Sequence, residues 1–354
     1  MRTISRRCAP LLQRRSAHPS LVSVPEPAQR PRRRPLPVVI DTDPGIDDML
    51  AIYLCVYSPE LDVRGISVSY GNTLVENAHR NAVEILRRAG KRARLAVGAR
   101  RPLVRPLAVA HETHGESGLG YAALPPAGVI LDFVRPLERL LAEQPEPVTL
   151  VTLGPLTSLA LALRRDAELV RSKVGRHIAM AGTLEAKGNT TPLSEFNAWC
   201  DPEALQTVLH AELPTELVGL DVTRQFVLDS ADVERLGRTG APFASWLHAA
   251  LRFYVEFHRQ HEGLDGCVLN DVLPIAALLQ PEAVTFQPMR IAVDLAVDAR
   301  RGRTTVAPDG ADVLVATEAR LPAIRALLSE RVFRRAALPA AAPESRAAKE
   351  EAHA

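Results

Sequence analysis

The sequence lacks long apolar runs and clustered cysteines. No uninterrupted apolar stretch reaches the 18 or so residues that a membrane-spanning helix needs, so we expect no membrane contact. The four cysteines (Cys8, Cys55, Cys200 and Cys267) form no CxxC pair. This scatter argues against a zinc ribbon or a disulfide scaffold and fits a reducing compartment, so we expect a cytoplasmic protein.

Lysine is almost absent, and the basic charge is concentrated at the N-terminus. Four Lys accompany 39 Arg among the 354 residues. Residues 1–36 hold nine Arg and one acid; without them the formal net charge changes from +2 to about −6. The basic pI therefore belongs to the N-terminal segment, and we expect no nucleic-acid partner.

Composition divides the chain into three parts. Residues 1–36 are Arg- and Pro-rich, which resembles an organelle transit peptide, although a simple disordered extension is the interpretation that we prefer. No apolar stretch of 7–15 residues follows this basic start, so a secretory signal is not expected. Residues 336–354 are Ala/Pro/Glu-rich and predicted to be disordered. Residues 37–335 are interpreted as one domain.

Strand-like and helix-like segments alternate in this domain. Short apolar runs predict strands at residues 36–40, 63–69, 95–97, 148–153, 177–181 and 215–220. Helices are predicted at residues 47–57, 76–89, 157–164, 202–210 and 251–261. The pattern predicts an α/β fold of the Rossmann-like kind, with an open, mostly parallel central sheet and helices on both faces. Ligands of such sheets bind at the carboxyl ends of the strands. The residues there are Asp41, Asp43, Asn72, Gly154, Gly182 and Asp221.

Four carboxylates lie within the eight residues Asp41–Asp48 (DTDPGIDD). Carboxylates this close repel one another unless a cation binds, and oxygen ligands suit Ca²⁺ or Mg²⁺. The segment is not an EF-hand loop, because Ile46 and Ile52 stand where Gly and Glu are required.

A strand that ends in DxD also suggests a haloacid-dehalogenase-type phosphatase. That family usually has Gly-Thr after the second Asp and needs a downstream Lys. Here Pro44-Gly45-Ile46 follows, and Lys is scarce. This interpretation is kept as a second alternative.

Seven segments, in order, resemble the motifs of the inosine–uridine-preferring nucleoside hydrolase family, over about residues 37–335. They are residues 38–51 (VVIDTDPGIDDMLA), 70–73 (YGNT), 114–120 (HGESGLG), 153–159 (LGPLTSL), 188–202 (GNTTPLSEFNAWCDP), 218–223 (VGLDVT) and 270–273 (NDVL). The resemblance implies calcium-dependent hydrolysis of the N-glycosidic bond of ribonucleosides, giving free base and ribose in nucleoside catabolism or salvage. It also implies a homodimer or homotetramer.

The resemblance implies a role for each matching residue. Asp43, Asp48, the Leu153 carbonyl and Asp271 would bind Ca²⁺, which would lower the pKa of a bound water and orient it. Asp43 would also act as general base on that water. The ribose would be held by Asp47, Asn72, Asn189, Glu195, Asn197 and Asp271. If Glu195–Asn197 is extended, residues 195 and 197 face the same side. Firm binding of the 2′-hydroxyl predicts poor turnover of 2′-deoxynucleosides.

The last motif departs from the family pattern. The family has His-Asp, and that His is associated with protonation of the leaving base; here Asn270 stands in its place. Asn donates a hydrogen bond but supplies no proton near pH 7. Three alternatives follow. In the first, His258, His261 or His114 substitutes as the acid that protonates the leaving base. In the second, the substrates have leaving groups that need less activation, and in the third the chain binds ribose or nucleosides without hydrolysing them. Base specificity is not readable from the sequence.

Overall fold

The computed structural model describes residues 34–126 and 136–338. The predicted leader and tail lie almost wholly outside these residues, so the predicted boundaries remain predictions. From Pro35 onward the described residues form one compact unit. None of the helices described is long and apolar enough to cross a membrane.

Eleven strands occur among the described residues, and nine of them form one sheet. They are β1 (Leu36–Thr42), β2 (Leu61–Val68), β3 (Leu95–Val97), β4 (Val148–Thr152), β5 (Val174–Ala179), β6 (Thr215–Leu217), β7 (Val227–Asp229), β8 (Gly266–Val268), β9 (Val284–Val293), β10 (Thr304–Val306) and β11 (Ala311–Ala319). The order in the large sheet is β10-β9-β11-β6-β5-β4-β1-β2-β3, and β7 pairs with β8 separately. From β11 to β3 all neighbours are parallel, whereas β9 is antiparallel to both β10 and β11. The predicted, mostly parallel sheet is confirmed.

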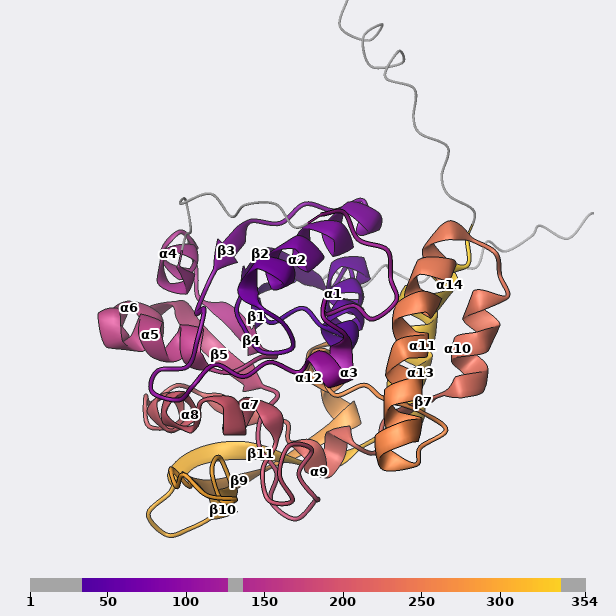
Figure 1. Cartoon of the computed structure of the whole chain (residues 1–354). Coiled ribbons are helices and arrows are strands. Elements are labelled where there is room, and N and C mark those ends of the chain that lie inside the picture. The colour runs from indigo at the N-terminus through magenta and orange to yellow at the C-terminus, as the bar shows by residue number, and fades with distance from the viewer. Residues whose placement is uncertain (1–33, 127–135, 339–354) are drawn as a thin grey trace, which may run out of the picture. The chain divides into compact units, whose positions relative to one another are not determined.

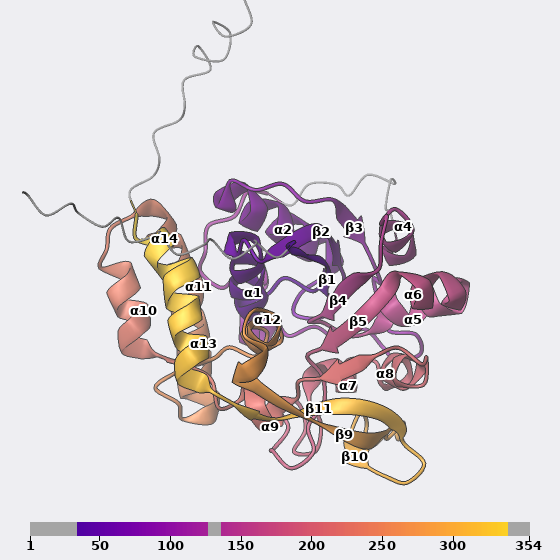
Figure 2. The same ribbon diagram turned by 180° about the vertical axis from the view of Figure 1, so that it is seen from behind.

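The helices cover both faces of this sheet (Figures 1 and 2). They are α1 (Ile46–Tyr57), α2 (Val75–Ala89), α3 (His111–His114), α4 (Leu137–Ala142), α5 (Thr157–Arg165), α6 (Ala167–Lys173), α7 (Phe196–Cys200), α8 (Pro202–Leu209), α9 (Leu220–Thr223), α10 (Ser230–Gly237), α11 (Pro242–Glu262), α12 (Val272–Leu279), α13 (Leu321–Leu328) and α14 (Arg334–Ala336). A 3₁₀ turn at Pro281–Ala283 and a π-helical turn at Ser329–Phe333 complete the set.

The central strands are apolar on both sides because each side meets a different helical layer. In β1, Val38 and Ile40 pack into the core under α1, α2, α11 and α12, while Val39 packs into the core under α4, α5 and α8. In β4, Val151 and Leu150 divide in the same way. Side chains alternate between the two faces of a strand, so these continuous apolar runs feed two cores at once.

Most predicted elements occur within three residues of their predicted bounds. The exceptions are informative. The strand predicted at residues 215–220 ends at Leu217, and the chain turns into α9. The helix predicted to begin at residue 251 begins at Pro242. The antiparallel strands β9, β10 and β11, which no motif marked, complete one end of the sheet.

Candidate active site

The loops after the parallel strands surround one cavity of about 930 Å³. The residues predicted from the sequence that line it are Asp47, Asn72, His114, Leu153, Asn189, Glu195, Asn197, His258, His261, Asn270 and Asp271. They come from segments as far apart as α1 and the start of α12, and the fold brings them together at the carboxyl edge of the sheet. Asp43 and Asp48 are buried (1% and 0% exposed) and are not among the described residues that line the cavity.

The tightest acidic cluster among the described residues consists of Asp47, Asp48 and Asp271. Each offers a carboxylate oxygen, and these oxygens lie within 4.8 Å of one another. Asp47 and Asp48 begin α1, and Asp271 precedes α12, which packs beside it. The cluster therefore joins two helix N-termini, where negative charge is favoured.

Burial and mutual repulsion both oppose ionisation of these carboxylates. Burial first, and then the charge of Asp48, raise the pKa of Asp47 to about 7. Burial, and then Asp47 and Asp48, raise the pKa of Asp271 well above its ordinary value. Burial and then Asp48 raise the pKa of Asp43 in the same direction. A bound cation would offset both effects.

Asp43 and Asp48 are held by the loop that follows β2. The Asn72 backbone N–H donates to Asp43 Oδ2 over 2.6 Å, and Asn72 Nδ2 donates to Asp48 Oδ2 over 2.7 Å. Asp48 Oδ2 also accepts from the Gly45 N–H, and its Oδ1 accepts from the Thr42 hydroxyl. Asp43 Oδ1, in contrast, is buried without a hydrogen-bond partner among the described residues.

The Asp43 carboxylate fits between two glycines. A Cβ on Gly154 would lie 2.5 Å from Asp43 Oδ1, and a Cβ on Gly71 would overlap its Oδ2. Gly71 also has φ of +155°, which other residues rarely adopt. Both glycines therefore leave space for this one carboxylate.

The available donors fit a hard divalent cation. They are carboxylate oxygens, the buried and unpartnered Asp43 Oδ1, and the Leu153 carbonyl at the cavity wall. Calcium takes carboxylate and carbonyl oxygens in this way, whereas the described part of the cavity wall offers no cysteine.

The segment Glu195–Asn197 is not extended throughout, because α7 begins at Phe196, so the argument from alternating side chains does not apply to it. Glu195 is the N-cap of α7, and its carboxylate accepts from the backbone N–H groups of Asn197 and Ala198 and from Gly182 N–H at 3.0 Å. Exposed helix N–H donors attract the carboxylate and turn the chain into a helix at this point. Burial still raises the pKa of Glu195 to about 7.

The four asparagines of the cavity present different groups to it. Nδ2 of Asn72 is used by Asp48, and Nδ2 of Asn197 is used by the carbonyls of Leu153 (2.6 Å) and Met180, so both present Oδ1. Oδ1 of Asn189 accepts from Phe196 N–H, which leaves its amino group. The arrangement offers both acceptors and donors, with the amide orientations following from these partners.

The side of the cavity formed by α3 and α11 is aromatic. Tyr254, Phe257, His258 and His261 line it from α11, and His111 and His114 line it from α3. The Tyr254 ring lies 5.1 Å from the ring of His114 and 4.5 Å from that of His258. A flat nucleobase fits such a wall.

Two of these histidines are neutral with opposite tautomers. His114 Nδ1 accepts from the Ile46 N–H, so the proton is on Nε2. His258 Nδ1 donates to the Tyr254 carbonyl, so its Nε2 carries the lone pair. Burial, with a further contribution from His258, lowers the pKa of His114 to about 3, and burial also lowers the pKa of His258.

Two features of the cavity differ from what the sequence indicated. Asp221 accepts from the N–H groups of residues 184–186 and is not among the described lining residues, so it shapes a loop. Trp199, in contrast, is not among these lining residues and packs under the Arg301 guanidinium at 4.0 Å. An ion pair between Arg224 and Glu262 (2.5 Å) lines the cavity, and no sequence motif indicated it.

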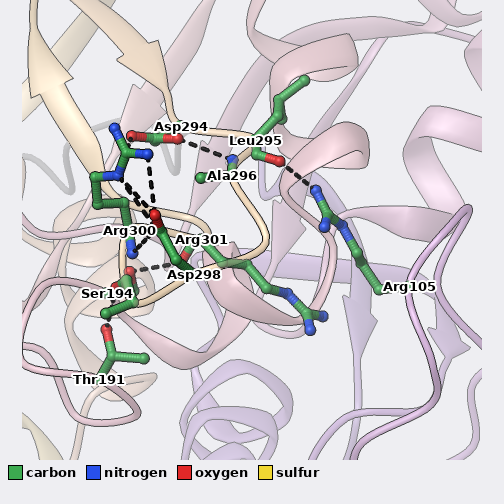
Figure 3. A network of polar contacts seen from close by, with 10 residues as sticks. Arg105, Thr191, Ser194, Asp294, Leu295, Ala296, Asp298, Arg300 and Arg301 are labelled. Atoms are coloured by element: carbon green, nitrogen blue, oxygen red, sulfur yellow. Dashed lines mark hydrogen bonds and ion pairs between the residues drawn. The ribbon is translucent and has the colours of Figure 1, made fainter.

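The loop between β9 and β10 braces one wall of the cavity. Figure 3 shows it beside Thr191 and Ser194, whose hydroxyls donate to the carbonyls of Ala299 (3.2 Å) and Arg301 (2.6 Å). Arg105 donates to the Leu295 carbonyl over 2.6 Å on the other side of the loop. Residues 188–192 line the cavity, so this loop holds them in place from outside.

At the carboxyl edge of the parallel sheet, the cavity thus combines a buried carboxylate cluster with an aromatic wall, which suits a ligand with a polar and a flat aromatic part. The model of the family "inosine-uridine preferring nucleoside hydrolase" matches residues 38–327. The chain belongs to this family.

Curated relatives and solved structures agree with this membership. The pyrimidine-specific ribonucleoside hydrolase RihA of Citrobacter koseri is 40% identical over 276 residues, covering 77% of this chain and 88% of the relative. A plant nucleoside hydrolase, PpNRh1, superposes with a TM-score of 0.77 at 32% identity, covering 85% of this chain and 99% of that one. A purine-preferring ribonucleoside hydrolase from Gardnerella vaginalis gives 0.75 at 26% identity, with 85% and 99% coverage. The chain is thus a ribonucleoside hydrolase, an N-glycosyl hydrolase whose substrates are small nucleosides.

Proposed function

We propose that the chain hydrolyses pyrimidine ribonucleosides with Ca²⁺ as its cofactor, releasing the free base and ribose. The observation that carries the proposal is the buried carboxylate cluster at the floor of a cavity with one aromatic wall. The cluster suits a sugar and a cation, and the aromatic wall suits a base. The pyrimidine preference rests on the similarity to curated relatives that are named pyrimidine-specific.

The residues that would hold Ca²⁺ are Asp43, Asp48, Asp271 and the Leu153 carbonyl, with Asp47 close enough to share it. When bound, the cation supplies electrostatic activation of the attacking water and a firm attachment for ribose hydroxyls. Asp47, Asn72, Glu195 and Asn197 present acceptor oxygens to those hydroxyls, while Asn189 presents an amino group.

Asp43 is proposed as the general base. Its Oδ1 is buried and has no hydrogen-bond partner among the described residues, so a lone pair is free to accept the proton of the attacking water. As the water oxygen bonds to C1′ of the ribose, Oδ1 takes the water's proton. The C1′–N bond breaks, and its electron pair goes to the base nitrogen. The positive charge that develops on the ribose ring is stabilised by the surrounding carboxylates.

The leaving base is proposed to be helped by hydrogen bonds. His114 and His258 were predicted as substitute acids, but their lowered pKa values leave both without an extra proton at neutral pH. Of the two, only His114 therefore offers a donor to the departing base, its neutral Nε2–H, because Nε2 of His258 carries a lone pair and is an acceptor. His261, on the next turn of α11, lines the same wall.

Ribose release from uridine, cytidine, inosine, adenosine and guanosine tests the proposal. Protein stripped of metal is compared with the same protein given Ca²⁺ or Mg²⁺, and with Asp43→Asn. Calcium-dependent release that is greatest for the pyrimidines and lost in Asp43→Asn is expected. Release by metal-free protein, or by Mg²⁺ alone, would contradict the calcium assignment. The named relatives do not favour the non-hydrolytic or phosphatase alternatives. The homo-oligomeric state and the cytoplasmic location remain predictions.

A further inference from the structure

Asn270 has four polar groups, and three of them already have hydrogen-bond partners within the protein. Its backbone N–H donates to the Asp47 carboxylate. Its carbonyl accepts from Leu273 N–H at 3.3 Å. Its Oδ1 accepts from the Thr223 hydroxyl at 2.8 Å. Only the amino group, Nδ2, remains without a partner among the described residues, and Asn270 lines the cavity.

The backbone holds Thr223 opposite Asn270. Thr223 is the last residue of α9 and is fully buried. Phe226 N–H donates to the Thr223 carbonyl, and Leu269 N–H donates to the Phe226 carbonyl over 3.1 Å. The antiparallel pair β7–β8 continues the same register, with Val227 opposite Val268. The contact between the two side chains is therefore fixed by a ladder of backbone hydrogen bonds.

We propose that Thr223 is a positioning residue whose hydroxyl fixes the Asn270 amide, so that its amino group donates a hydrogen bond to the departing base. An amide is nearly symmetrical in shape and can turn by 180° about its last bond. With its Oδ1 held by the Thr223 hydroxyl, the amide presents a donor to the cavity; turned over, it would present an acceptor that repels a base gaining negative charge.

The location of Asn270 within the cavity supports a contact with the base. One neighbour in the chain is Asp271 of the carboxylate cluster, to which the proposed function assigns the cation and the sugar. The aromatic wall carries Tyr254 and His258. Asn270 thus lies where the sugar part of the cavity meets the base part, and the glycosidic bond joins these two. This inference rests on the proposed function.

The departing base needs a hydrogen bond from Asn270, but Asn270 does not transfer a proton to it. When C1′–N breaks, the electron pair stays on the base, and the charge spreads to its ring carbonyl oxygen. Hydrogen bonds to a charged acceptor are stronger than neutral ones, so the bond gains strength in the transition state. Solvent then supplies the proton that completes the free base, while the proton taken from the attacking water returns to solvent.

The test uses two substrates, uridine and 4-nitrophenyl riboside, whose nitrophenolate leaves without help. Thr223→Val removes the hydroxyl and keeps the shape; Thr223→Ser retains the hydroxyl. Thr207→Val is the matched control, because the Thr207 hydroxyl donates to a backbone carbonyl within α8, and Thr207 is not among the described residues that line the cavity. Thermal unfolding and circular dichroism establish that each variant is folded.

For Thr223→Val we expect kcat on uridine to fall by about 10- to 100-fold, the worth of a hydrogen bond to a charged group. KM should change little, and kcat on the nitrophenyl riboside should stay within about twofold. Thr223→Ser should restore most of the uridine rate, and Thr207→Val should match the wild type. In an Asn270→Ala background, adding Thr223→Val should have no further effect, because Thr223 acts through that amide.

An equal loss on both substrates, or unchanged uridine turnover in a folded Thr223→Val protein, would overturn the proposal. So would a Thr223→Val effect that persists in the Asn270→Ala background. Failure of the proposed function is visible separately in the wild type: if it releases ribose from no nucleoside, the amide has no base to assist, and this inference falls with it.

Discussion

A methyl group at Gly154 is expected to displace the proposed general base without disturbing the backbone. The φ angle of Gly154 lies outside the left-handed region, so alanine fits the main chain there. Its Cβ, however, would lie 2.5 Å from Asp43 Oδ1 and 2.8 Å from Asp43 Cγ. Since side-chain contacts of this kind are rarely closer than about 3.0–3.4 Å, the carboxylate has to move by about 0.5–0.9 Å.

The magnitude follows from this displacement. A misplacement of about 1 Å costs a reaction about 100-fold in rate, and we expect kcat/KM of Gly154→Ala on uridine to fall by about that factor. Overpacking a buried site costs about 1–3 kcal/mol of the free energy of unfolding. Activity should therefore be nearly lost in a protein that is still folded at 25 °C.

The assay is ribose release with saturating Ca²⁺, measured beside urea unfolding of the same preparation. Gly175→Ala is the matched control: Gly175 lies in β5, and its nearest neighbour to an added Cβ is Pro147 at 3.2 Å. The control should retain wild-type activity. If Gly154→Ala keeps more than about a third of wild-type kcat/KM while folded, then either Asp43 is not the base or its position is not critical.

Three further predictions concern the charge of the carboxylate cluster, the pH dependence of stability, and the loop between β9 and β10 that braces the cavity wall. Asp271→Asn removes one of three close carboxylates, so without metal the Tm of the variant should exceed the wild-type Tm by about 2–4 °C. Added Ca²⁺ should strongly raise the Tm of the wild type only. If the variant has the lower Tm in the presence of a chelator, the three carboxylates do not destabilise the metal-free fold by repulsion. Burial lowers the pKa of His177 from 6.5 to about 3, so between these pH values the unfolded chain binds a proton that the folded chain does not, and stability falls as the pH falls through this range. Wild-type stability should therefore fall between pH 6 and pH 4 more steeply than that of His177→Gln, by up to about 1.4 kcal/mol per pH unit in urea unfolding, and parallel slopes would refute the assignment. Arg301→Ala removes the stack on Trp199 and the hydrogen bond to the Cys200 carbonyl. The KM for uridine should therefore rise several-fold and the free energy of unfolding should fall by about 1–2 kcal/mol, with Arg301→Lys between Arg301→Ala and the wild type. An unchanged KM would show that the loop between β9 and β10 has no part in substrate binding.

Local patterns in the sequence were sufficient to predict the parallel part of the sheet. Apolar runs such as residues 36–40 and 148–153 are buried on both faces, and this leaves a signal in five or six consecutive residues. The strands β9 and β11 alternate between buried and exposed residues, with one face covered, and the sequence offered no motif to mark them. Their place at one end of the sheet depends on pairing with each other and with β6.

The same distinction holds for the site. The density of carboxylates in residues 41–48, directly after an apolar strand, was enough to predict a cation site at the sheet edge, because so many like charges have no other local explanation. What each side chain does there was not readable. That residue 195 also caps a helix depends on unpaired N–H groups that exist only once α7 has formed.

Only the tertiary structure decided which oxygens come together and which way each amide points. Asp271 joins Asp47 and Asp48 across more than 220 residues of sequence because α1 packs beside α12. The orientation of Asn270 depends on a hydroxyl 47 residues away that reaches it through the β7–β8 pair. Residue types and their local spacing determined the kind of chemistry, since they are properties of short segments. Orientation and proximity arise from long-range packing, which no short segment contains.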